Sequence, residues 1–579
     1  MVLMSREKIC LLAALIVSFV ATGMARAQGG NEQLRTVFLD VSVLSMTTPE
    51  VVTDRAVIIQ GDAIVAITER ANYEQTKGDQ VIDGKGGVLI PGLIDAHVHI
   101  DHPQDLGMLP LYGVTTAVNM RGLPWHLRAR QTIREGRRFS ADFITSGDYV
   151  DGYPPDMLPM TSVDGVAAAR RAVIAQHSAG FDFIKVYSEL SREQYLAVCD
   201  QARQLGIGVA GHIPDAVSIE DLTACPHANV AHGEQLFKVL GSRQDSEIIA
   251  ADLEALSQAS VTVTGNISLY LENAKQPFDL DQLIDRPEAK LIHPATFQPF
   301  RPGINRYARR DEAWAERVTE VAKDVQAISR LAENVDSSML VAGSDMPVAG
   351  AYPGISLLQE IESYAAAGLS PFQALSTATI NAARLIHRLD PDFPSIGAIV
   401  VGARADLVLL ESNPLADLQV LRSPQGVMLR GAWYDKAQLA AISESLIASN
   451  ADAATRVESL ESAVFAGNLE AARQLFTFYR QHSPEEILFA QYPYFFFGFS
   501  LLYGDEGLTD DPEQAQKAVL LYDMYQQTYP EFHSAHHVYG LALEAAGDKP
   551  GALAAQKKAV SIHADYPPAL KAIARLTAE

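Results

Sequence analysis

Two histidines, His97 and His99, stand two residues apart at the end of the apolar run VLIPGLIDAHVH. Side chains of a strand alternate between its two faces, so both imidazoles point to the same side and form half of a potential metal site. The pair is weak evidence by itself, because the chain has 15 histidines. Four further potential ligands strengthen the prediction, since each ends a different apolar segment: Lys185 in FDFIKVY, His212 in GVAGH, His232 in NVAH and Asp345 in LVAGSD.

These segments belong to a series of apolar, strand-like runs that alternate with amphipathic helical stretches along residues 89–389. The strand candidates are VLIPGLIDAHVH, GVTTAVNM, DFITSGD, FDFIKVY, IGVAGH, ANVAH, VTVTGN and SSMLVAGSD. Strands that alternate with helices predict parallel βα units, and such a series predicts an α/β fold of the (β/α)8 TIM-barrel type. The carboxyl ends of barrel strands meet at one rim, so the candidate ligands would become neighbours there.

Several motifs within residues 35–435 resemble those of the amidohydrolase superfamily, in its imidazolonepropionase-like and Xaa-Pro dipeptidase branch. They are PGLIDAHVH, FIKVY, AGH, AHGE, AGSD, TATINAAR and GAIVVGARADLVLLESNPLAD. The resemblance implies two divalent metal ions, with Zn2+ as the expected ion. It assigns His97, His99 and Asp345 to the first metal, His212 and His232 to the second, and a carboxylated Lys185 to both.

The chemistry of Lys185 agrees with that role. An ammonium group beside two divalent cations would be repelled and has no lone pair to donate, so this lysine must be neutral or modified. Addition of CO2 to the neutral amine gives a carbamate, which offers two oxygen ligands. A lysine at a strand end is more often solvated and paired with a surface acid, but Phe183, Ile184 and Val186 surround this one with apolar side chains.

Two divalent ions lower the pKa of a bridging water and polarise a scissile carbonyl, so we expect hydrolysis by a metal-bridging hydroxide. Asp345 would carry the proton of that water to the leaving group, although pure ligation is the alternative. Tyr187 should point to the same side as Lys185 and could donate a hydrogen bond to the substrate, and packing explains it equally well. Candidate anchors for a substrate carboxylate are Arg121, His293 and Arg301, although a loop arginine is more often a surface charge.

The expected reaction is hydrolysis of a C–N bond in an amide, a cyclic amide or a dipeptide, and the substrate is a small molecule or short peptide. The same metal site would also serve a lactone or other ester. FIKVY is followed by Ser188-Glu189-Leu190 rather than by a Gly-rich turn, which weakens a specific assignment as a proline dipeptidase. The alternative of another class is a binding or scaffold protein with a vestigial barrel, but a vestigial site should have lost at least one ligand.

The first 27 residues predict a cleavable signal peptide. Arg6 and Lys8 precede an apolar run, and Ala25-Arg26-Ala27 forms a small-x-small cleavage site. The run is shorter than a membrane span, so we expect a periplasmic or secreted protein without a membrane anchor rather than an uncleaved one. The formal net charge of −24 makes nucleic acid an unfavourable partner.

Changes in the residue pattern along the chain define the bounds of the remaining regions. Strand-like residues 28–87 and 396–435 should build a shared β-sandwich beside a barrel of residues 88–395. Residues 436–579 predict tetratricopeptide-like helical repeats that could bind a protein partner, and residues 533–566 match the repeat template best. The long interval 266–338 predicts an irregular active-site lid. Cys199 and Cys225 are expected to be separate buried thiols rather than a bridge, because their spacing dictates no pairing.

Overall fold

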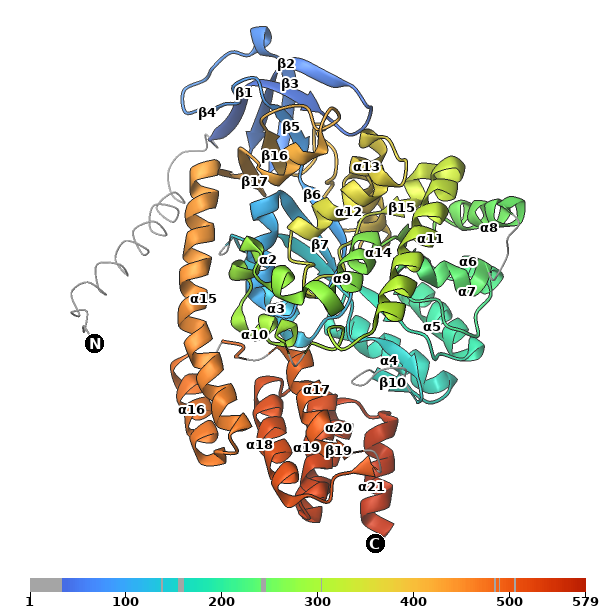
Figure 1. Cartoon of the computed structure of the whole chain (residues 1–579). Coiled ribbons are helices and arrows are strands. Elements are labelled where there is room, and N and C mark those ends of the chain that lie inside the picture. The colour runs from blue at the N-terminus through green and yellow to red at the C-terminus, as the bar shows by residue number, and fades with distance from the viewer. Residues whose placement is uncertain are drawn as a thin grey trace, which may run out of the picture.

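The computed structural model describes residues 34–578 apart from 137–138, 155–160, 241–245, 303–304, 484–485, 489 and 505–506. The predicted signal peptide, residues 1–27, lies outside the described residues. A β-sheet lies at one end of the molecule, a mixed α/β body in the middle, and a helical region along one side and at the other end (Figure 1). Among the described helices, none combines the length and the apolar character needed to cross a membrane.

Strands from both ends of the α/β body share the terminal sheet. Its order is β18-β17-β16-β5-β1-β2-β3, with β4 paired to β1. The expected sandwich is thus one hydrogen-bonded sheet, joined where β5 pairs with β16 in antiparallel register. The bounds are β1 Arg35–Leu44, β2 Val51–Gln60, β3 Ala63–Glu69, β4 Gln80–Asp83, β5 Val88–Pro91, β16 Leu407–Leu410, β17 Gly426–Leu429 and β18 Ala432–Asp435.

Each of the eight predicted strand segments of the body contains a strand. They are β6 Leu93–Val98, β7 Val114–Asn119, β8 Asp142–Thr145, β11 Phe183–Val186, β12 Gly208–Gly211, β13 His227–Val230, β14 Thr262–Thr264 and β15 Leu340–Val341. The first segment divides into β5 and β6, so the body begins at Leu93 and β5 belongs to the terminal sheet. Every residue of these eight strands is buried, as parallel strands covered on both faces should be.

The eight strands form two parallel sheets. One has the order β6-β7-β8, and the other continues through β11, β12, β13, β14 and β15 and also includes β9 (Val150–Gly152) and β10 (Thr161–Val163). Isolated parallel bridges link the two sheets, one between Ser146, just after β8, and Phe183 of β11, and one between Val98 of β6 and Met346, which follows β15. All eight strands therefore run in one direction, and their carboxyl ends lie on one side of the body.

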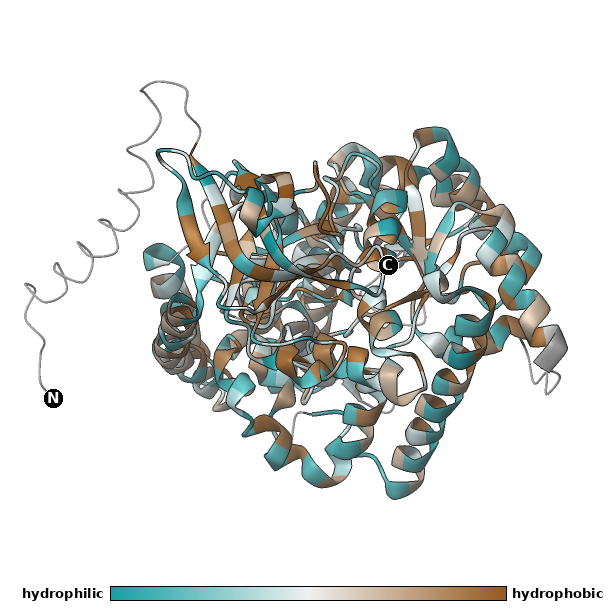
Figure 2. Ribbon diagram, turned by 90° about the horizontal axis from the view of Figure 1, so that it is seen from above, coloured by the Kyte–Doolittle hydropathy of each residue, from teal (hydrophilic) through white to brown (hydrophobic). Residues whose placement is uncertain are grey.

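Helices cover the outside of the two parallel sheets. In Figure 2 their colours change between hydrophilic and hydrophobic along each helix, as expected where one face packs inward. The bounds are α2 Pro103–Met108, α3 Pro124–Arg134, α4 Val166–Ala179, α5 Arg192–Leu205, α6 Ile219–Ala224, α7 Leu236–Leu240, α8 Ser246–Gln258, α9 Ile267–Ile284, α10 Pro294–Phe297, α11 Glu312–Asp336, α12 Ile355–Ala366, α13 Pro371–Thr377 and α14 Ile380–Leu389.

The prediction of an irregular lid over residues 266–338 is wrong, because α9, α10 and α11 occupy most of this interval. In α11 the carboxylate of Asp311 accepts a hydrogen bond from the backbone N–H of Trp314, which caps the first turn. Ala315, Ala322 and Val325 follow at helical spacing and are buried, so the helix packs on the body.

The expectation of two separate thiols is also wrong, because Cys199 and Cys225 form a disulfide. Cys199 lies on α5, and Cys225 directly follows α6. These helices lie on either side of β12 in the chain, which brings the two α-carbons to 5.2 Å. The fold, and not the sequence spacing, creates the pair.

The described part of residues 436–579 is mainly helical, as predicted, and also contains two short paired strands, β19 Tyr503–Gly504 and β20 Gly507–Leu508. The bounds are α15 Lys436–Phe465, α16 Leu469–His482, α17 Gln491–Leu502, α18 Pro512–Thr528, α19 His533–Ala545, α20 Lys549–Ile562 and α21 Pro567–Ala578. Helices α19 and α20 cover the segment that matches the repeat template, and Gly540 allows their close contact, since a β-carbon there would lie 3.3 Å from the carbonyl oxygen of Ala552. Membership in the tetratricopeptide class stays a prediction.

The helical region packs against the α/β body over a mixed interface. Asn450 on α15 donates hydrogen bonds to the carbonyls of Lys290 and Ile292, both at 2.9 Å. An apolar cluster joins Leu123 and Trp125 of the body to side chains of the helical region, including Leu460, Phe476, Tyr529 and Phe532. The helical region therefore belongs to the same packed structure as the body and is not a detached module.

Candidate metal centre

The first group of predicted ligands meets at the carboxyl end of β6. Nε2 of His97 lies 3.1 Å and Nε2 of His99 lies 2.9 Å from the same carboxylate oxygen, Oδ1 of Asp345. The two Nε2 atoms are 3.4 Å apart. Two imidazole nitrogens and one carboxylate oxygen thus converge on one point, which is the donor set that a divalent transition metal prefers.

The second group lies beside the first. Nδ1 of His232 is 3.7 Å from Oδ2 of Asp345, and the His232 ring lies 5.1 Å from the ring of His212. His97, His232 and Asp345 form a group that could hold a metal ion. Lys185 is fully buried, and its Nζ lies 5.9 Å from the ring centre of Tyr149, whose hydroxyl contacts His99. The structure therefore brings all six predicted ligands together.

The backbone fits this arrangement closely. At Gly211, just before His212, a β-carbon would lie 2.3 Å from the carbonyl oxygen of Val186 and 2.9 Å from Cδ of Lys185. Only glycine fits there, because any β-carbon would collide with the backbone of Val186 beside the lysine. Asp345 and His232 adopt positive φ angles of 51° and 68°. Such conformations are costly for residues with side chains and concentrate at functional sites.

Asp95, which the sequence did not single out, holds the ends of β6 and β15 in place. Its fully buried carboxylate accepts hydrogen bonds from the backbone N–H and the hydroxyl of Ser344 at 2.9 and 2.6 Å, and from the backbone N–H of His97 at 3.2 Å. The Asp95 side chain thus fixes both Ser344, which precedes Asp345, and His97. Such supporting contacts set the orientation of metal-binding groups.

The electrostatics suit a cation-binding site. Burial and the neighbouring Lys185 lower the pKa of His97 well below its usual value, and burial together with His232 does the same for His212, so both imidazoles are neutral and offer lone pairs. Burial lowers the pKa of Lys185 to about 7, which makes a neutral amine accessible. Burial alone would raise the pKa of Asp345, but His97 and His232 hold it well below its usual range.

Two tyrosines, Tyr187 and Tyr149, contact the predicted ligands. The ring of Tyr187 stacks on His212 with centroids 3.8 Å apart, and Tyr149 places its hydroxyl 3.3 Å from Nδ1 of His99. Tyr187 thus lies beside His212, and its hydrogen bond to the substrate stays a prediction. Tyr149 was not anticipated, because it follows β8 in a loop without a recognisable motif.

The three predicted substrate anchors have different positions. Arg121 lines a pocket beside His99 and donates from Nε to Oδ1 of the buried Asp148 at 2.9 Å. His293 instead stacks on His102 at 3.8 Å. Arg301 pairs with Glu461 of α15 at 2.8 Å. The structure thus brings only Arg121 to the pocket, while Arg301 joins the helical region to the body.

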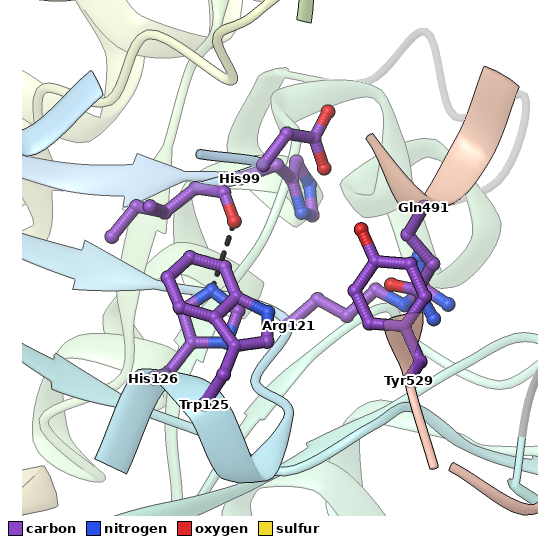
Figure 3. A pocket seen from close by; sticks show the side chains of 8 residues that line it. His99, Arg121, Trp125, His126, Gln491 and Tyr529 are labelled. Carbon is purple, nitrogen blue, oxygen red and sulfur yellow. Dashed lines mark hydrogen bonds between the residues drawn. The ribbon is translucent and has the colours of Figure 1, made fainter. Parts of the chain in front are cut away.

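The pocket beside His99 is built from two regions of the chain (Figure 3). The α/β body contributes His99, Ile100, Asp101, Arg121, Trp125 and His126. The helical region contributes Gln491 and Tyr529. His126 is fixed by donating to the carbonyl of Ile100 at 2.8 Å. A mixed α/β fold with a histidine and carboxylate cluster beside such a pocket defines a candidate metal-dependent hydrolase.

Comparison with known proteins agrees with this class. The Amidohydrolase family model matches residues 88–434. Imidazolonepropionase of Streptomyces griseus subsp. griseus is 24% identical over 406 residues, which cover 64% of this chain and 90% of that protein. The chain belongs to the amidohydrolase family, which confirms the family predicted from the sequence.

Two solved structures are similar in fold. Bottromycin amidohydrolase has a TM-score of 0.57 at 23% identity, with 72% of this chain and 90% of that chain covered. A Xaa-Pro dipeptidase with bound methionine in its active site has a TM-score of 0.53 at 17% identity, with 69% and 100% covered. The enzymes similar to this chain are hydrolases that act on carbon–nitrogen bonds, as the sequence predicted.

Proposed function

We propose that this protein is an exported binuclear metal-dependent amidohydrolase that cleaves a carbon–nitrogen bond, and that its two linked parallel sheets form a (β/α)8 barrel. The observation that carries the proposal is the convergence of His97, His99 and His232 on the single carboxylate of Asp345. Four imidazoles, one carboxylate and a buried lysine are a donor set that suits two divalent cations, which supports the proposal.

The six predicted ligands would be shared between the two metal ions. His97, His99 and Asp345 would hold the first, and His212 and His232 the second. Lys185, carboxylated by CO2, would bridge both, and its lowered pKa supports the reaction because only the neutral amine adds CO2. Bound divalent ions supply Lewis acidity, which polarises a carbonyl and makes water nucleophilic at neutral pH.

Asp345 is the proposed proton carrier. Its pKa is held low by the histidines, so the carboxylate is ionised and able to accept a proton from the attacking water. It would then pass that proton to the departing nitrogen. Tyr187, which stacks on His212, would donate its hydroxyl proton in a hydrogen bond to the substrate carbonyl.

Export is supported by the disulfide between Cys199 and Cys225, because disulfides persist in oxidising compartments outside the cytosol. Together with the signal-like first 27 residues, it favours the periplasm or the exterior of the cell. Alkylation of free thiols before and after reduction, in protein recovered from each compartment, tests this part of the proposal.

The experiment that tests the activity is a substrate screen with the zinc-loaded full chain. The panel contains dipeptides, N-acyl amino acids, N-acyl amino acid amides, cyclic imides and lactones. Turnover of one or more of the first four classes, lost in the His97→Ala variant, supports the proposal. Turnover of lactones alone would change the bond type, and no turnover with metal bound would refute the assignment.

A further inference from the structure

Gln491, the first residue of α17, brings an unsatisfied hydrogen-bond donor to the pocket beside His99. The residue is only 5% exposed, and among the described residues nothing accepts a hydrogen bond from its Nε2. A buried amide nitrogen without a partner is costly, so its position needs an explanation. In Figure 3 the side chain lies with Tyr529 on the side of the pocket opposite Trp125 and His126.

The charge of the pocket limits which group of a ligand can accept a hydrogen bond from Gln491. Arg121 brings a positive charge, but Asp148 pairs with its Nε at 2.9 Å, and both side chains are buried. Asp101 adds a second carboxylate to the pocket wall. Because Arg121 is already paired, a carboxylate buried beside Gln491 would lack a cation of its own, whereas a neutral carbonyl oxygen needs only the one donor that Gln491 supplies.

The helical region packs against the α/β body beside the pocket. Tyr529 and Phe532 belong to the apolar cluster that includes Leu123 of the body. The guanidinium carbon of Arg121 lies 6.0 Å from the ring centre of Phe532. Arg128 of α3 also forms an ion pair of 2.7 Å with Glu531, between these two aromatic residues. A wall held by a shared apolar core can select ligands by shape and hydrogen bonding.

We propose that the helical region completes the substrate site, and that Gln491 binds a second, neutral carbonyl group of the substrate, such as an amide carbonyl distant from the cleaved bond. The inference rests on the proposed function for the place of the cleaved bond. It assigns selectivity for neutral amides over free carboxylates to a residue outside the α/β body.

The test compares N-acetyl-leucinamide with N-acetyl-leucine, which differ only in a terminal amide or carboxylate. Affinities are measured by calorimetry on the zinc-loaded full chain, and a probe that is cleaved is scored by kcat/KM. The wild type should prefer the amide by about tenfold, and Gln491→Leu should reduce that preference to within about twofold, because one buried hydrogen bond is lost. Gln491→Asn keeps the amide group but shortens the side chain, and should fall between them.

Gln474→Leu is the matched control, since Gln474 is an exposed glutamine of α16 whose Nε2 bonds Glu470. It should keep the wild-type preference, and thermal unfolding checks that each variant is folded. An unchanged preference in Gln491→Leu, a wild-type preference for the carboxylate, or failure of both probes to bind would overturn the inference. Selective binding that depends on Gln491, without turnover of any amide, would instead overturn the proposed function and leave the inference standing.

Discussion

Replacing Asp95 with alanine tests how the fold positions the metal centre. The carboxylate accepts hydrogen bonds from the backbone N–H and hydroxyl of Ser344 and from the backbone N–H of His97, in a fully buried place. Each buried donor left without an acceptor costs about 1–3 kcal/mol, so the variant should lose about 3 kcal/mol or more of stability. The unfolding midpoint should fall by roughly 2–3 °C or more, because the unfolding entropy that divides this loss grows with chain length.

The same substitution should weaken metal binding, because Ser344 precedes Asp345 and His97 is itself a proposed ligand. Loss of a supporting contact typically costs about 10–100-fold in metal affinity. Zinc retention under titration with a chelator measures this effect, and Asp95→Asn, which keeps one acceptor oxygen, should lose less. Wild-type zinc retention and an unchanged unfolding midpoint in Asp95→Ala would refute the positioning role.

Three other perturbations have defined outcomes. Lys185→Ala should abolish turnover, and acetate or formate should partly restore it, whereas the surface substitution Lys323→Ala should leave turnover intact. Unchanged metal content and rate in Lys185→Ala would exclude a bridging role. Arg35 holds the pKa of Asp79 well below its usual value, so Asp79 stabilises the folded state above the unfolded pKa of 3.8 and that contribution disappears as pH falls below it. At pH 7 the Asp79→Asn variant should therefore be about 2 kcal/mol less stable than the wild type and unfold at a lower temperature. Near pH 3 the difference in stability should be smaller. Deleting residues 436–579 should expose apolar surface and lower solubility and the unfolding midpoint; a truncated protein as stable and selective as the full chain would show that the helical region only adjoins the body.

The periodic parts of the fold were predictable because local pattern determines them. The eight buried strands follow from short apolar runs, and His97, His212 and His232 lie at or just after the carboxyl ends of three of them. The helix α11 is harder to predict, because the Pro-rich, aromatic segment before it obscures the helical spacing of Ala315, Ala322 and Val325. The pairing of Cys199 with Cys225 depends on the packing of two helices, which sequence spacing does not encode.

The metal centre was predictable from motifs, but its surroundings were not. Asp95 acts through contacts with Ser344, 249 residues away in the chain. Gln491 reaches the pocket only because the helical region packs on Leu123 and Trp125. A glutamine at the start of a helix carries no local signal for such a role, so only the assembled structure reveals that the pocket has two contributors.

The most direct test of a binuclear centre is the metal content of the purified full chain after metal-replete expression, measured by mass spectrometry of the elements. Four imidazoles, the Asp345 carboxylate and a carboxylated Lys185 predict about two transition-metal ions per chain. One ion per chain would indicate a mononuclear site without the proposed lysine bridge. Fewer than one ion per chain would contradict the assignment as a metal-dependent hydrolase.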